Sequence, residues 1–116
     1  MAAVADTATT FARAGYLTLV DGILIPGWFY EPLTAHLIGA GLGVVTVILR
    51  PPLETCVTRV AQRSAVEPSV DRAAIEQLWT AFADLGQLEP LVIDNGGQAP
   101  EVTAEAVYAR ASAPSV

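Results

Sequence analysis

The stretch that decides the predicted fold is residues 16–22, which read YLTLVDG. A short run of apolar and β-branched residues is typical of a strand that is buried on both faces of a sheet. Asp21 and Gly22 end the run, because both residue types favour turns. The stretch therefore predicts a buried strand with an acidic residue at its carboxyl end.

The sequence on either side of this strand alternates helical patterns with further strand patterns. Helices are predicted at 2–14, 32–40, 53–63, 71–85 and 101–110, and two more strands at 44–49 and 91–93. Pro51 and Pro52 end the second strand, because proline donates no hydrogen bond to a sheet. Strands that alternate with helices imply a parallel sheet with right-handed crossovers. The predicted fold class is therefore α/β, in a single domain over residues 1–116 that ends in a frayed tail at 111–116.

The composition narrows the range of functions. The chain has 116 residues, of which 53% are hydrophobic and 16% charged, and its net charge is −6. This is enough apolar surface to exclude a disordered chain, and the acidic balance argues against nucleic acid as a partner. All six basic residues are arginines, so no lysine can form a Schiff base or reach a nucleotide phosphate.

Three further features indicate whether the chain spans a membrane and in which compartment it lies. Residues 32–49 carry no charged side chain, but proline and three glycines interrupt them, so they are interpreted as a helix, a glycine stop and a strand. The first ten residues have no basic region and include Asp6, which does not fit a secretory signal. Cys56 is the single cysteine, which suits a reducing compartment. We expect a cytoplasmic protein without a membrane partner.

Polar residues follow each predicted strand, at the edge where parallel sheets place ligands. Asp21 can hold Mg²⁺ or accept a proton from a substrate hydroxyl, or it can simply begin a turn. Arg50 ends the second strand as a phosphate contact or as a solvated strand end. The loop of Asn95, Gly96 and Gly97 follows the third strand, and it suits a flat ligand as well as a tight turn.

Two further groups are candidates for binding or catalysis. Arg59 and Arg63 stand one helical turn apart and can neutralise phosphoryl oxygens, although a solvated helix face is the ordinary interpretation. Trp28, Phe29 and Tyr30 occupy a loop beyond Asp21, where aromatic side chains line a substrate pocket or cover the edge of the sheet.

Taken together, these segments resemble the latter two-thirds of a P-loop kinase-type phosphotransferase. The group includes AAA-family ATPases, adenylate kinase, chloramphenicol phosphotransferase and zeta-toxin-like ATPases. The likeness is carried by residues 17–22, residues 47–56, the arginine pair 59 and 63, and residues 92–97. It implies a three-layer parallel sheet of the P-loop NTPase type, with residues 64–70 as a short lid connector.

The resemblance also implies a role for each candidate residue, with ATP and Mg²⁺ as cofactors. Asp21 would serve the metal ion or the substrate hydroxyl, and Arg59 and Arg63 would neutralise the transferred phosphate. Arg50 and residues 95–97 would contact ATP, and residues 28–30 would bind a small-molecule acceptor.

The sequence departs from this family in one essential part. The phosphate-binding run G-x-x-x-x-G-K-[ST] is absent, and with it the first strand and the first helix. That strand would lie between residues 16–20 and residues 44–49, so its loss leaves unpaired sheet edges. We therefore expect a truncated or mis-started ATP-dependent kinase that is inactive in this form. The alternative is a non-catalytic kinase-like module that binds a partner or forms a homo-oligomer through those edges.

Overall fold

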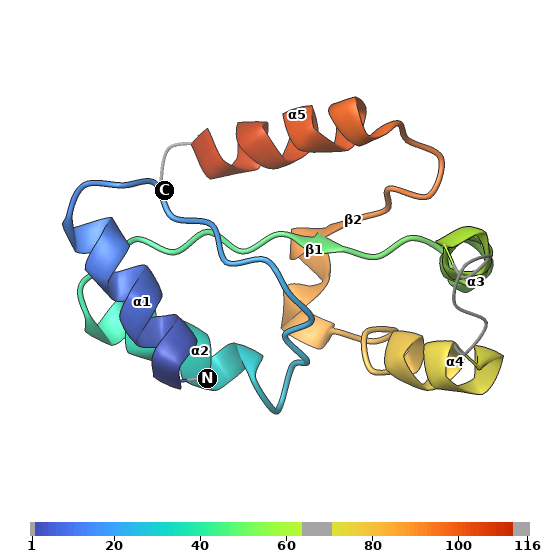
Figure 1. Ribbon diagram of the computed structural model, residues 1–116, viewed down its shortest axis with the longest axis horizontal. Helices are drawn as coiled ribbons and strands as arrows, with labels where there is room; N and C mark the ends of the chain where they lie inside the picture. The colour runs from blue at the N-terminus through green and yellow to red at the C-terminus, as the bar shows by residue number, and fades with distance from the viewer. Residues whose placement is uncertain (1, 64–70, 113–116) are drawn as a thin grey trace. The chain divides into compact units, whose positions relative to one another are not determined.

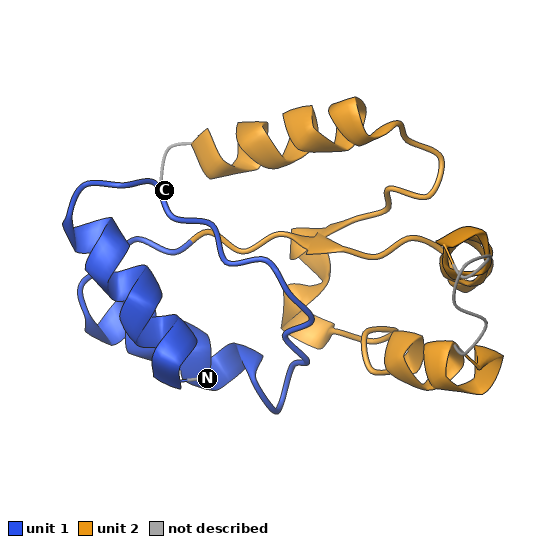
Figure 2. Cartoon of the chain, in the orientation of Figure 1, with its two compact units in different colours: residues 1–44 blue, residues 45–116 orange. Residues whose placement is uncertain are grey.

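The computed structural model describes residues 2–63 and 71–112, so the predicted lid connector 64–70 lies outside the described residues. The elements in chain order are α1 (Ala2–Arg13), α2 (Tyr30–Gly39), β1 (Ile48–Leu49), α3 (Leu53–Arg63), α4 (Arg72–Thr80), the 3-10 helix η1 (Gly86–Leu91), β2 (Val92–Ile93) and α5 (Pro100–Ser112) (Figure 1). The chain divides into two compact units, residues 1–44 and residues 45–116 (Figure 2). We call them unit 1 and unit 2.

The predicted three-layer α/β fold is wrong. Of the described residues, 59% are helical and 4% lie in strands, and these strands form a single sheet of two. β1 and β2 pair in parallel, with Ile48 opposite Val92 and Leu49 opposite Ile93. The parallel direction of the second and third predicted strands is confirmed, but only two residues of each form a ladder.

The strand predicted at residues 16–20 is absent. The segment has no regular secondary structure, and among the described residues the backbone amides of Leu17 to Val20 donate to no backbone carbonyl. An apolar run becomes a strand only when a neighbouring strand takes up its backbone hydrogen bonds. Residues 16–20 have no such neighbour in the described chain, and their leucines are exposed to solvent instead of being buried.

Unit 1 is built on a pair of helices. α1 and α2 pack against each other through a small cluster of buried side chains: Ala5, Ala8, Leu33 and Leu37. Leu24, Leu42 and Val44 add partly buried contacts around the cluster. Ile38, next to Leu37 in the sequence, is exposed, so only one narrow stripe of α2 faces α1.

Both helices of unit 1 end in the same backbone motif. Gly15 has a φ of 96° and donates to the Ala12 carbonyl at 3.0 Å, while Tyr16 donates to the Phe11 carbonyl at 3.2 Å. This bond pair is a Schellman motif, and the T-shaped contact of the Phe11 and Tyr16 rings, 6.0 Å apart, supplies its apolar contact. Gly15 thus closes α1.

The motif recurs at the end of α2. Gly41 has a φ of 83° and donates to the Ile38 carbonyl at 2.9 Å, and Leu42 donates to the Leu37 carbonyl at 3.2 Å. Leu42 packs against the buried cluster that contains Leu37. The chain therefore leaves each helix of unit 1 in a direction that glycine makes possible.

Unit 2 contains the strand pair, three α-helices and η1. α3 and α5 closely match their predicted ranges, whereas the helix predicted at 71–85 ends at Thr80. Asp71 caps α4, because its carboxylate accepts a hydrogen bond from the Ala73 amide at 3.2 Å. In Figure 1, α5 is drawn on one side of the strand pair and η1 on the other. None of the described helices combines the length and the apolar character that crossing a bilayer requires.

Candidate functional site

The predicted site residues are divided between the two units. Asp21 and residues 28–30 belong to unit 1, whereas Arg50, Arg59, Arg63 and residues 95–97 belong to unit 2. Each group is therefore described within its own unit.

Asp21 is exposed at the border of an open groove of about 490 Å³ in unit 1. The groove lies between α1 and the segment 18–21, and most of its lining is apolar: Ala3, Val4, Thr7, Ala8, Phe11, Thr18, Leu19, Val20 and Asp21. No arginine lines it, and the described residues contain no group of three or more side chains able to hold a metal ion. The groove thus suits an apolar occupant better than a phosphate.

The aromatic residues 28–30 form a turn that leads into α2. The amides of Trp28 and Phe29 both donate to the Ile25 carbonyl, at 3.1 and 3.0 Å. The Glu31 carboxylate accepts a hydrogen bond from the Gly27 amide at 2.7 Å, which closes the turn. The rings of Trp28 and Phe29 meet edge to face at 6.4 Å, and both residues are exposed. Their predicted role in binding an acceptor stays a prediction.

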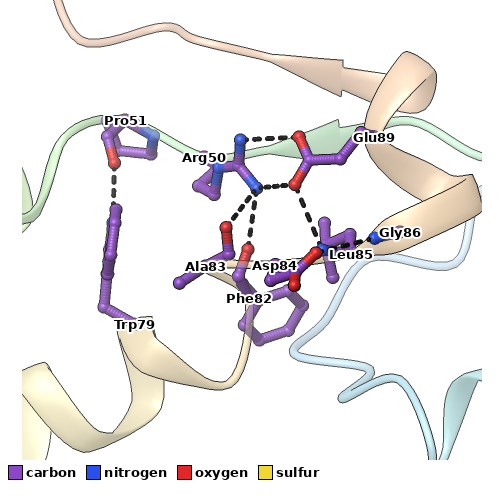
Figure 3. Close-up of polar contacts among 9 residues, drawn as sticks. All are labelled: Arg50, Pro51, Trp79, Phe82, Ala83, Asp84, Leu85, Gly86 and Glu89. Atoms are coloured by element: carbon purple, nitrogen blue, oxygen red, sulfur yellow. Dashed lines mark hydrogen bonds and ion pairs between the residues drawn. The ribbon is translucent and has the colours of Figure 1, made fainter.

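Arg50 is the most connected side chain of unit 2 (Figure 3). Its guanidinium forms two parallel hydrogen bonds to the Glu89 carboxylate, at 2.7 and 2.9 Å. The same group donates to the carbonyl of Phe82 at 2.8 Å and to that of Ala83 at 3.4 Å. Arg50 thereby joins the end of β1 to the turn after α4 and to η1. These partners occupy the guanidinium that was predicted to contact ATP.

Glu89 is the charged partner of Arg50. The hydrogen bond from Arg50, and then the one from the Leu85 amide at 3.1 Å, lower the pKa of Glu89 from its ordinary 4.5 to about 2. The hydrogen bond to Glu89 raises the pKa of Arg50. Trp79 strengthens the same region, because its indole nitrogen donates to the Pro51 carbonyl at 2.9 Å.

Sequence patterns did not single out Glu89. It stands 39 positions from Arg50, and no local spacing connects the two residues. The same holds for Arg72, which pairs with Glu54 of α3 and, at 2.7 Å, with Glu76 one turn further along α4. Only the Arg72–Glu76 spacing, at i and i+4, is a signal that the sequence carries.

Arg59 and the loop after β2 are brought together. The Arg59 guanidinium donates to the Asn95 carbonyl at 2.9 Å, so α3 is tied to the loop that was predicted to lie under adenine. The Asn95 side-chain oxygen is buried without a hydrogen-bond partner among the described residues. Arg63 lies in the last turn of α3 and is exposed.

A close contact explains why the loop has a glycine at position 96. Its φ does not fall in the left-handed region, but a Cβ atom built there would lie 2.6 Å from Cδ of Pro52. The Asp94 carboxylate also accepts a hydrogen bond from the Gly96 amide at 2.9 Å. Gly96 is thus needed for a close approach, and the group that it approaches is the chain itself. A Cβ at Gly97 would meet nothing within 4 Å.

Neither unit contains all of the residues that were predicted to bind ATP and Mg²⁺. Unit 1 contributes one exposed carboxylate beside an apolar groove, and in unit 2 the Arg50 guanidinium is engaged by Glu89 and two carbonyls. The predicted cofactors stay predictions.

Comparison with protein-family models, with curated proteins and with solved structures finds no match for this chain. No relative therefore assigns a role to any of its residues.

Proposed function

We propose that the protein is a non-catalytic module that binds another polypeptide chain through residues 16–20. The observation that carries this proposal is the state of that segment, which is apolar, exposed, and without regular secondary structure or a strand partner among the described residues. Leu17 is 87% exposed and Leu19 83% exposed. A strand from another chain would take up the backbone groups and cover the leucines at the same time.

The surroundings of the segment support this role. Most of the exposed large apolar side chains belong to unit 1, and four of them, Tyr16, Leu17, Leu19 and Val20, lie in this one segment. Contiguous exposed apolar surface on a protein is typical of an interaction site. The Schellman motif at Gly15 fixes the direction in which the segment leaves α1, so the segment is presented in a defined orientation.

A synthetic strand peptide tests the proposal without knowledge of the natural partner. The probe is a fluorescein-labelled ten-residue peptide with six alternating valines and threonines between pairs of lysines. We expect its fluorescence anisotropy to rise saturably with protein concentration. A peptide with prolines at its two central positions has the same charge and cannot pair, so it is expected not to bind.

Two variants show where the peptide binds. The double variant Leu17→Asp and Leu19→Asp places charges on the pairing face, and we expect at least a tenfold loss of affinity. Ile38→Asp changes an equally apolar, 62% exposed side chain on α2 and serves as the matched control. Equal binding of both peptides, or equal binding by the two variants, would overturn the proposal.

ATP-dependent phosphotransfer to a small molecule is the second candidate function. The hydrogen bond from Arg59 to the Asn95 carbonyl favours it, since the arginine predicted to neutralise the transferred phosphate contacts the loop predicted to contact ATP. We expect no measurable ATP turnover by the 116-residue chain, because it contains no phosphate-binding run. Calorimetric titration with ATP and Mg²⁺, repeated with Arg59→Ala, tests nucleotide binding. Binding that Arg59→Ala abolishes would support this candidate, and ATP hydrolysis lost on Asp21→Ala would contradict the expected inactivity.

A further inference from the structure

We infer that the polypeptide bound by residues 16–20 is the same segment of a second copy of this chain, paired antiparallel about a two-fold axis at Thr18. The inference rests on the proposed function and adds the identity and the register of the partner. It is argued from three features of the segment: its side-chain pattern, its charge, and the amides that it leaves without an acceptor.

The side-chain pattern is self-complementary. In an antiparallel pair centred on Thr18, Leu17 of one copy lies opposite Leu19 of the other. Tyr16 lies opposite Val20, and the two threonines face each other. The highly exposed leucines of both copies then share one face of the ribbon and pack side by side on it. Apolar pairs and threonine pairs directly across two strands are among the favourable cross-strand combinations.

The charge pattern allows the same register. Each copy has a net charge of −6, so pairing of two copies requires that acidic side chains do not meet. The acidic residue next to the segment is Asp21, and in this register it lies opposite Gly15 of the other copy. The two carboxylates stand at opposite ends of the ribbon, where screening by salt weakens their repulsion.

The amides without a backbone acceptor determine which of the cross-strand pairs can be hydrogen-bonded. The Tyr16 amide already donates to the Phe11 carbonyl, and the Gly15 amide to the Ala12 carbonyl. Leu17 and Leu19 have amides without a backbone acceptor among the described residues, so they can serve as the hydrogen-bonded pairs. Thr18 then takes the position between them, where residues directly opposite each other are about 4.5 Å apart at Cα. The Schellman motif of α1 therefore limits the pairing to residues 16–20.

Disulfide trapping tests the register. In a Cys56→Ser background, Thr18→Cys places two thiols at a Cα separation of about 4.5 Å, which a disulfide can span. Val20→Cys is the matched control, because the two copies of residue 20 would be about 14 Å apart at a rise of ~3.4 Å per residue. We expect mild oxidation to convert most of the Thr18→Cys protein, and less than a tenth of the Val20→Cys protein, to a covalent dimer.

Light scattering after size exclusion separates the possible results. We expect the unmodified chain to show twice the monomer mass at high concentration, and the Leu17→Asp, Leu19→Asp variant to remain a monomer throughout. A dimer in which Thr18→Cys does not cross-link would overturn the register. A chain that stays monomeric but binds the strand peptide would overturn the second copy as partner and leave the proposed function standing. A monomer that binds no strand peptide would overturn both.

Discussion

Arg50 shows how much of unit 2 depends on one side chain. Its guanidinium reaches η1 through Glu89 and the turn after α4 through the carbonyls of Phe82 and Ala83. The side chain is mostly buried, and charge-assisted hydrogen bonds of this bidentate kind are stronger than neutral ones. We therefore attribute a structural role to Arg50 in addition to any ligand contact that it makes.

The Arg50–Glu89 pair predicts an acid-dependent loss of stability. The pKa of Glu89 is lowered from 4.5 to about 2 in the folded chain, so the pair stabilises the fold fully above pH 4.5. This contribution is lost as the pH falls from 4.5 towards about 2. Glu89→Gln is expected to have a lower Tm than the unmodified chain at pH 7, with the difference shrinking as the pH approaches 2.

Thermal unfolding followed by circular dichroism from pH 2 to pH 7 measures this effect. Glu105→Gln, in an exposed position of α5, is the control for the removal of one carboxylate. A Glu89→Gln difference that is the same at pH 2 and pH 7 would contradict the role of the pair.

Gly96 makes a second prediction for a single residue. Gly96→Ala places a methyl group 2.6 Å from Cδ of Pro52, a ring that cannot rotate away. We expect a loss of about 1–3 kcal/mol in the free energy of unfolding, as overpacked sites show. Gly97→Ala has open space and should be neutral or stabilising by up to about 1 kcal/mol. Urea unfolding of the two variants compares them directly, and equal stabilities would refute this explanation.

Single-residue features could be predicted where the reason for them is local. Gly15 follows a helical run and Asp71 precedes one, so their capping roles are visible in the sequence. The pairing of Arg50 with Glu89 was not visible, because it depends on how distant segments come together. For Gly96 the sequence indicated a loop suited to a flat ligand or a tight turn, but it could not show that the close neighbour is Pro52 of the same chain.

At the scale of elements, the two Schellman motifs of unit 1 make a prediction. Gly15→Ala and Gly41→Ala each force a side chain into a backbone conformation that costs about 1–2 kcal/mol. Neither added Cβ meets another atom within 4 Å, so the loss would come from the backbone alone. Gly43→Ala is the matched control, since Gly43 has neither a positive φ nor a close neighbour. Guanidinium unfolding should rank Gly43→Ala as the most stable of the three variants.

Helices were predicted better than strands, and the difference has a physical cause. The hydrogen bonds of a helix connect residues four apart, so local composition and apolar spacing suffice to locate α1, α2, α3 and α5, and Asp71 marks the start of α4. A strand needs a partner that the local sequence does not specify. Residues 16–20 and 44–49 have equally good strand composition, yet only Ile48 and Leu49 find a partner in β2.

For the molecule as a whole, the small amount of enclosed apolar surface is the main feature. None of the large side chains in the described residues is fully buried, and the cluster of unit 1 consists of two alanines and two leucines. Leu33 is 3% exposed and is one of only two large residues in that cluster. A core of this size contributes little to the free energy of unfolding, so a cavity in it removes a large share of that stability.

Leu33→Ala should therefore destabilise unit 1 by at least about 2 kcal/mol, the lower end for such truncations in cores. Ile38→Ala, on the exposed side of the same helix, should change the free energy of unfolding by less than about 0.5 kcal/mol. Chemical unfolding at protein concentrations where the chain is monomeric measures both values. A similar loss for the two variants would show that the described cluster does not hold the helices together.

The two tryptophans of the chain occupy different units and different surroundings. Trp28 is 72% exposed in the turn before α2, whereas the indole of Trp79 is half-buried and donates to the Pro51 carbonyl. Iodide should quench the fluorescence of Trp28 strongly and that of Trp79 weakly, and Trp79 should emit at the shorter wavelength. Single-tryptophan variants thus turn each unit into its own optical reporter, and the order in which the two signals change in urea reveals whether the units unfold together.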